Sequence, residues 1–119
     1  MEKTYTIGER KFVMRPFNLR DILRVTGKMG LLPTEVLKRA ATPEERMRNL
    51  DTKDQLLVRC SRRPKLTLEE YPVTPDGTMP VAELTDAEYS ELFTSLATDS
   101  GYTMEAAEEI RPTSEAPAS

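Results

Sequence analysis

Few residues in this sequence could carry catalytic chemistry. The chain has a single cysteine, Cys60, and no histidine. Neither an internal disulfide nor a Cys–His nucleophile pair can therefore form, and a zinc site built from cysteine and histidine is excluded for the same reason. We interpret Cys60 as a small buried hydrophobic residue rather than a reactive thiol, because no neighbouring base or metal is available to activate it.

The acidic residues that could act as acids or bases occur in pairs with a simpler explanation. Each pair lies near an expected helix start or on a solvated face, and the helix dipole stabilises negative charge near a helix start. The glycines form neither of the phosphate-binding patterns GxGxxG and GxxxxGK. We therefore expect no enzymatic activity, no cofactor and no catalytic or metal-binding residue. The pairs are Glu44–Glu45, Glu69–Glu70 and Glu108–Glu109.

A dense basic run is a candidate for binding a partner. It consists of Arg59, Arg62, Arg63 and Lys65, at the expected end of a central helix. Cations at a helix end stabilise the helix dipole, and they could also contact phosphate or an acidic protein. Because the chain carries a net charge of −3 and the run contains no aromatic residue, nucleic acid is disfavoured as its partner.

Charge is distributed very unevenly along the chain. Residues 1–65 contain 16 basic and 8 acidic side chains, whereas residues 66–119 contain 1 basic and 12 acidic side chains. The acidic half could fold back and neutralise the basic half, which we favour because the two are already close in one small chain. Alternatively, the two halves could attract other copies or another protein head to tail.

The first element expected to position these residues is an N-terminal hairpin. Polar and apolar residues alternate over residues 3–7 and 11–15, and Gly8-Glu9 between them suits a tight turn. Pro16 ends the second strand because proline cannot donate a hydrogen bond to a sheet. Two strands alone are marginally stable, so we expect the hairpin to pack against helices.

Three helical stretches are expected to follow the hairpin. Asn18 caps the first, which stops near Gly27 or Gly30, and Pro33-Thr34 opens a short second one. The capping box of residues 42–45 begins a longer helix that ends before Pro64, with a break possible near Leu50. The apolar stripe expected for the first helix is Leu19, Ile22, Leu23 and Thr26, and that of the longest is Met47, Leu50, Leu57 and Val58.

A proline-rich stretch separates these helices from a final one. Residues 63–81 contain four prolines and are expected to be irregular, with a single helical turn at residues 67–70. A second capping box at residues 85–88 starts the final helix, and Gly101 ends it. Its apolar stripe is interpreted as core, although it could instead hold a partner helix in a groove. The stripe consists of Tyr89, Leu92, Phe93 and Leu96.

The composition changes after Gly101. Residues 103–110 could form a short acidic helix, and residues 111–119 are expected to be disordered alone because they cannot bury an apolar face. We therefore predict an α+β fold that is mostly α-helical, with a hairpin and helical domain at residues 1–101 and a flexible, acidic, proline-containing tail at residues 102–119. No apolar run is long enough to cross a membrane and no signal peptide is evident, so we expect a cytoplasmic protein.

The order of these parts resembles the small tail assembly chaperones of long-tailed bacteriophages. In that family a short strand pair precedes helices, a central helix runs into a Pro-Lys-Leu-like segment, and a Leu-Thr-Asp start leads into a final helix that closes with Ser-Gly. The corresponding segments here are Thr6–Phe17, Leu56–Cys60, Pro64–Leu66, Met79–Glu88 and Ser100–Gly101.

The resemblance implies a non-enzymatic role in the host cytoplasm during virion assembly. Proteins of this family coat the helical tape-measure protein while the tail tube polymerises around it, and they are then lost from the particle. The resemblance therefore implies the tape-measure protein or another tail protein as partner, and the chain could also form homo-oligomers. The family defines no catalytic residues. The alternatives are a structural or adaptor subunit retained in the tail or baseplate, and a nucleic-acid-binding regulator.

Overall fold

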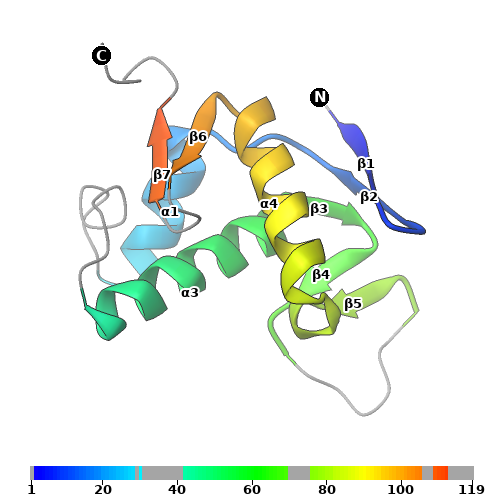
Figure 1. Ribbon diagram of the computed structural model, residues 1–119, viewed down its shortest axis with the longest axis horizontal. Helices are drawn as coiled ribbons and strands as arrows, with labels where there is room; N and C mark the ends of the chain where they lie inside the picture. Colours follow the sequence, from blue (N-terminus) through cyan, green and yellow to red (C-terminus); the bar gives the residue numbers. More distant parts are fainter. Residues whose placement is uncertain (1, 29, 31–41, 70–75, 106–108, 113–119) are drawn as a thin grey trace.

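Three helices and seven short strands form the part of the chain described by the computed structural model, which comprises residues 2–28, 30, 42–69, 76–105 and 109–112. This arrangement confirms the α+β prediction (Figure 1). In chain order the elements are β1 (Lys3–Ile7), β2 (Arg10–Met14), α1 (Leu19–Lys28), α3 (Pro43–Cys60), β3 (Ser61–Arg63), β4 (Lys65–Thr67), β5 (Thr78–Pro80), a 3-10 turn (Val81–Glu83), α4 (Asp86–Asp99), β6 (Tyr102–Glu105) and β7 (Glu109–Pro112).

The N-terminal hairpin forms as predicted. Strands β1 and β2 pair antiparallel with Tyr5 opposite Phe12, and Gly8 takes the positive φ of 63° that the two-residue turn requires. One face of the hairpin is buried in the core, which fixes the register because a shift of one residue would expose that face. Strand β3 pairs with β2 and completes a three-stranded sheet. The buried residues of the hairpin are Tyr5, Ile7, Phe12 and Met14.

Helix α1 forms where predicted and buries Ile22 and Thr26 of the predicted stripe, but its inward face is shifted from the one expected. Leu19 and Leu23, which we assigned to the buried stripe, are exposed. The helix is rotated because Asp21 points inward to bind Arg15 and Arg59. The residues that α1 buries are Asp21, Ile22, Val25 and Thr26.

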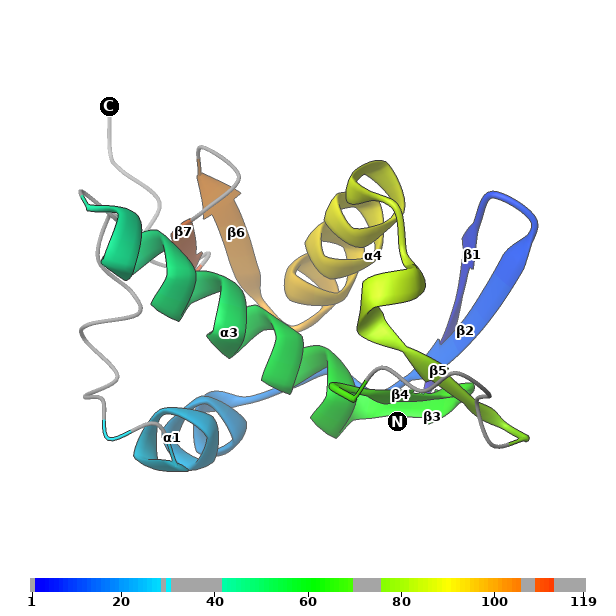
Figure 2. The ribbon, with the colours of Figure 1, turned by 90° about the horizontal axis from the view of Figure 1, so that it is seen from below.

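Helix α3 is continuous from Pro43 to Cys60, so the break expected near Leu50 does not occur. Thr42 caps its start by accepting a hydrogen bond from the Glu45 backbone. The C-terminal half enters the core while Met47 and Leu50 stay exposed. Viewed from below, α3 runs between α1 and α4 (Figure 2). The buried apolar residues of α3 are Leu56, Leu57 and Cys60.

A two-stranded parallel sheet includes Thr67, the first residue of the helical turn predicted at residues 67–70, and the next two residues, Leu68 and Glu69, are not helical either. Strand β4 pairs with β5, with Leu66 opposite Met79, and both residues are buried. The burial of these apolar side chains outweighs the weak helix-start signal at Thr67. Residues 70–75 lie outside the described residues, as does the helix predicted from Pro33.

Helix α4 closes the core, as its apolar pattern predicts. Its capping box is complete: the Glu88 backbone donates to the Thr85 hydroxyl, and the Glu88 carboxylate accepts from the Thr85 backbone. Gly101 follows the helix with a φ of 87°. The aromatic ring of Phe93 stacks on that of Phe17, with centroids 6.0 Å apart.

The short acidic helix predicted for residues 103–110 is wrong at residues 103–105 and 109–110, the part of it that the structure describes. Strands β6 and β7 form an antiparallel pair instead, with Met104 opposite Ile110. Aromatic and β-branched residues favour extended backbone, and the ring of Tyr102 is anchored on Phe17 at 5.3 Å between centroids. The extended conformation therefore begins directly after Gly101. Residues 113–119 lie outside the described residues.

None of the described helices combines the length and the hydropathy that a bilayer-spanning helix needs.

We predict that Thr85→Ala destabilises the protein by about 1 kcal/mol, because the backbone at the start of α4 loses its capping acceptor. Urea unfolding monitored by circular dichroism measures the change. Thr94→Ala, at an exposed position of the same helix, is the matched control and is expected to leave the free energy of unfolding within about 0.5 kcal/mol of the original protein. Equal losses in both variants would contradict the capping role.

Candidate functional site

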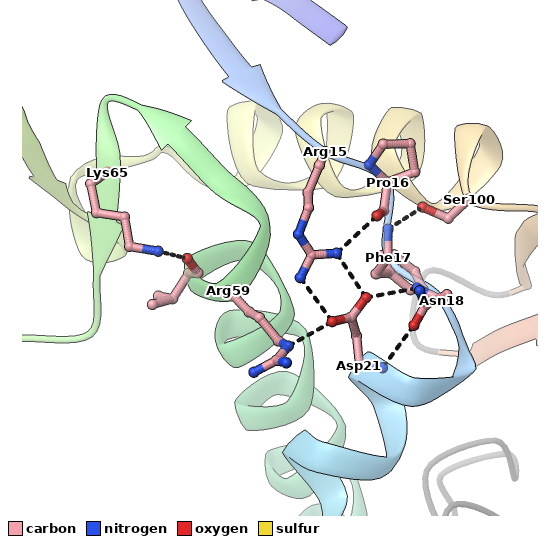
Figure 3. Close-up of polar contacts among 9 residues, drawn as sticks. Arg15, Pro16, Phe17, Asn18, Asp21, Arg59, Lys65 and Ser100 are labelled. Atoms are coloured by element: carbon pink, nitrogen blue, oxygen red, sulfur yellow. Dashed lines mark hydrogen bonds and ion pairs between the residues drawn. The ribbon is translucent and has the colours of Figure 1, made fainter. Parts of the chain in front are cut away.

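A buried carboxylate links the hairpin to the two helices that follow it. The side chain of Asp21 is only 4% exposed. It accepts hydrogen bonds from both terminal nitrogens of Arg15, at 2.9 and 2.8 Å, and from Nε of Arg59 at 2.6 Å (Figure 3). The backbone N–H of Asn18 donates to the same carboxylate at 2.9 Å. Residues from the end of β2, from α1 and from α3 are thereby joined at one point.

The electrostatics of this cluster leave a positive charge at the surface. The bond to Arg15, with further bonds from Arg59 and Asn18, holds the pKa of Asp21 well below its usual range. Two guanidinium groups thus share one ionised carboxylate. The remaining charge of about +1 lies where α1 meets α3.

A hollow with a volume of about 380 Å³ opens beside this cluster. We call it the basic hollow. Its cations come from α1, α3 and β4, and its wall also contains apolar side chains. No acidic residue lines it among those that the structure describes. The lining residues are Arg24, Val25, Lys28, Gln55, Val58, Arg59, Lys65 and Leu68.

Lys65 adds charge to this hollow without an acidic partner there. Its ammonium group donates a hydrogen bond to the backbone carbonyl of Val58 (Figure 3). Partial burial, followed by the positive charge of Arg62, lowers the pKa of Lys65. The charged form of Lys65 is therefore disfavoured by its surroundings, and a nearby anion would stabilise it.

A second hollow, with a volume of about 320 Å³, lies next to the first. We call it the acidic hollow, because the two charged residues that line it are Asp54 and Asp86. Leu68, which is 52% exposed, lines both hollows and separates them. The full lining is Leu50, Asp54, Leu68, Val81, Ala82, Leu84, Asp86 and Tyr89.

Asp54 is held in place by Tyr89. The Tyr89 hydroxyl donates to a carboxylate oxygen of Asp54 at 2.5 Å. Burial raises the pKa of Asp54, the bond from Tyr89 opposes that effect, and the negative charge of Asp51 adds to it. The bond from Tyr89 and the positive charge of Lys53 offset burial only in part, so the pKa of Asp54 is raised, whereas that of Asp21 is lowered.

The residues of the predicted basic run do not form one surface, because each makes different contacts. Arg59 binds Asp21 and also lines the basic hollow. Arg62 forms an ion pair with Glu2 at 3.5 Å. Arg63 is exposed on β3, and it does not line either hollow.

The apolar stripe predicted on the final helix is confirmed as core. Leu92, Phe93 and Leu96 are buried and do not form an open groove, whereas Tyr89 reaches the acidic hollow. Cys60 is also fully buried, as we interpreted it, and burial raises the pKa of its thiol to about 11.

Sequence reasoning missed Asp21, although a local signal was present. Asn18 and Asp21 bind each other reciprocally: the Asn18 side chain accepts from the Asp21 backbone, and the Asp21 side chain accepts from the Asn18 backbone. This is the geometry of a capping box, built here from Asn and Asp. The spacing of Arg24 and Lys28, one helical turn apart, was a second signal for a basic helix face.

Among the residues that the structure describes, no group of three acidic, cysteine or histidine side chains is arranged to hold a metal ion. Comparison of the chain with protein-family models, with curated proteins and with solved structures gives no match.

We predict that Asp21→Asn destabilises the protein by about 2–3 kcal/mol, because two partly buried guanidinium groups lose their shared anion. Asp51→Asn, at an exposed position of α3, is the control and is expected to change the free energy of unfolding by less than about 0.5 kcal/mol. Chemical denaturation at neutral pH measures both.

The stability that Asp21 contributes should depend on pH. The pKa of Asp21 is lower in the folded than in the unfolded protein, so its contribution is complete above the unfolded value of about 4 and declines as the pH falls below it. The stability difference between the original protein and Asp21→Asn should therefore shrink below about pH 4. A difference that stays constant down to pH 2 would argue against the ion pairs.

Proposed function

We propose that this protein is a tail assembly chaperone of a long-tailed bacteriophage, a non-enzymatic protein that binds the helical tape-measure protein during tail assembly. The observation that supports this best is the half-exposed Leu68 between two hollows of opposite charge. The resemblance of segments such as Leu56–Cys60 and Met79–Glu88 to that family points to the same role.

An exposed apolar surface beside charged side chains is typical of a protein-binding site. Leu50 is 40% exposed and Leu68 is 52% exposed, and both line the acidic hollow. Val58 adds apolar surface in the basic hollow. A helical client with an apolar stripe would bury these side chains in the manner of a helix in a groove.

The buried ionisable groups favour a binding role over a catalytic one. Asp21 is neutralised by two arginines, and the Tyr89 hydroxyl is engaged by Asp54. Cys60 is fully buried with a raised pKa, so its thiolate is disfavoured. These groups stabilise one another within the fold, and the proposed function requires none of them to react.

Co-expression with a phage tape-measure protein, a long helical protein, tests the proposal. We predict that the original protein keeps that product soluble and co-purifies with it. Leu68→Asp should reduce co-purification at least about tenfold, because a charge in the contact loses roughly 1.4 kcal/mol or more of apolar burial.

Leu19→Asp is the matched control, because Leu19 is equally exposed and lines neither hollow. It should co-purify as the original protein does. Failure of the original protein to solubilise or retain the helical product would refute the chaperone function.

Protein analysis of purified virions provides an independent prediction. A chaperone acts only during assembly, so we expect this chain in lysates of infected cells and not in finished particles. A stoichiometric copy in each particle would replace the proposal with the structural or adaptor role.

A further inference from the structure

We infer that the segment bound across Leu68 is an amphipathic helix that carries an acidic and a basic side chain two turns apart on one face, with an apolar side chain between them. The acidic side chain enters the basic hollow and the basic one enters the acidic hollow. This inference deepens the proposed function and rests on it, because it specifies the chemistry of the client.

The first support is the opposite charge of the two hollows. The basic hollow is lined by four cations and the acidic hollow by two carboxylates. A client with only one sign of charge would be attracted to one hollow and repelled by the other. A client that carries both an acidic and a basic side chain is attracted to both hollows. The charged lining residues are Arg24, Lys28, Arg59 and Lys65 on one side, and Asp54 and Asp86 on the other.

The second support is that each hollow contains a charged group whose ionised form is disfavoured by its surroundings. Lys65 is partly buried among other cations, and Asp54 is half-buried near Asp51. In both cases a side chain of opposite sign from a partner would stabilise the ionised form. By contrast, Asp21 already has two cationic partners and needs no further one.

The third support is the spacing. Asp54 and Arg59 are five residues apart on α3, which is about 7.5 Å along the helix axis. Arg24 and Lys28, which come from a different helix, also line the basic hollow. Client residues i and i+7 lie on one helix face about 10.5 Å apart. An apolar residue at i+3 or i+4 then falls between them, opposite Leu68.

Binding of three synthetic helical peptides to the full-length chain tests the inference. Each peptide is alanine-rich and about 18 residues long, a length at which such a peptide is substantially helical. The three share a leucine at i+3 and differ only at i and i+7, which are Glu and Lys, Glu and Glu, or Lys and Lys. Fluorescence anisotropy measures each dissociation constant. We expect the Glu/Lys helix to bind at least tenfold more tightly than either of the others.

Variants assign each charge to its hollow. Asp54→Asn should weaken binding of the Glu/Lys helix about tenfold and leave the Glu/Glu helix unchanged or bound more tightly. Asp86→Asn, at an exposed position, should act in the same direction if Asp54→Asn proves poorly folded. Arg24→Glu combined with Lys28→Glu should weaken binding of the Glu/Lys helix by a similar factor. The control Arg20→Glu, at an exposed position of α1 outside both hollows, should leave binding unchanged.

Three outcomes would overturn the inference. The Glu/Glu helix could bind as tightly as the Glu/Lys helix, no helix could bind, or a single-stranded oligonucleotide could displace the Glu/Lys helix with steeply salt-dependent affinity, which would identify a nucleic-acid site. The chaperone function is judged separately. If the tape-measure protein co-purifies equally well with Asp54→Asn, the inferred charge pairing is refuted. The chaperone function is still supported in that case.

Discussion

The shared carboxylate of Asp21 is the constraint on which the arrangement of the first half of the chain depends. Arg15 comes from the end of the hairpin and Arg59 from the last turn of α3, and both meet on this one side chain. Buried ion pairs contribute little net stability but are costly to break. Their main effect here is geometric, because α1 can occupy only the rotation that presents Asp21 inward. That rotation exposes Arg24 and Lys28 toward the basic hollow.

A second set of contacts ties the N-terminal segment to the end of α4. The Tyr5 hydroxyl donates to Asp99 at 2.6 Å, and Lys3 forms an ion pair with the same carboxylate at 3.2 Å. The Phe17 backbone donates to the Ser100 hydroxyl at 2.9 Å. Helix α4 therefore closes the core over the hairpin, while the hollows lie on the α3 side. Core and candidate binding surface adjoin, because Val25, Val81 and Leu84 are buried in the core and also line the hollows.

Local signals in the sequence predicted the hairpin, the start of α3 and all of α4, since turn glycines and capping boxes act over a few residues. The predictions fail where contacts between residues far apart in the sequence determine which side chains are buried. Leu19 and Leu23 fit an apolar stripe, yet they are exposed and Asp21 is buried, because Asp21 binds Arg59. Arg59 lies 38 positions further along the chain, so no local pattern reveals this contact. Leu68 could not be assigned to a surface from the sequence, since its neighbours come from three other parts of the chain.

The contacts between the N-terminal segment and the end of α4 also affect how the protein is made. Tyr5 and Asp99 are separated by 94 positions, and ribosomes add about 5–20 residues each second. The hairpin therefore emerges from the exit tunnel roughly 5–20 s before the helix that covers its apolar face. During that interval Ile7, Phe12 and Met14 lack the cover that α4 gives them in the finished fold, so the nascent hairpin exposes apolar surface until α4 has been synthesised.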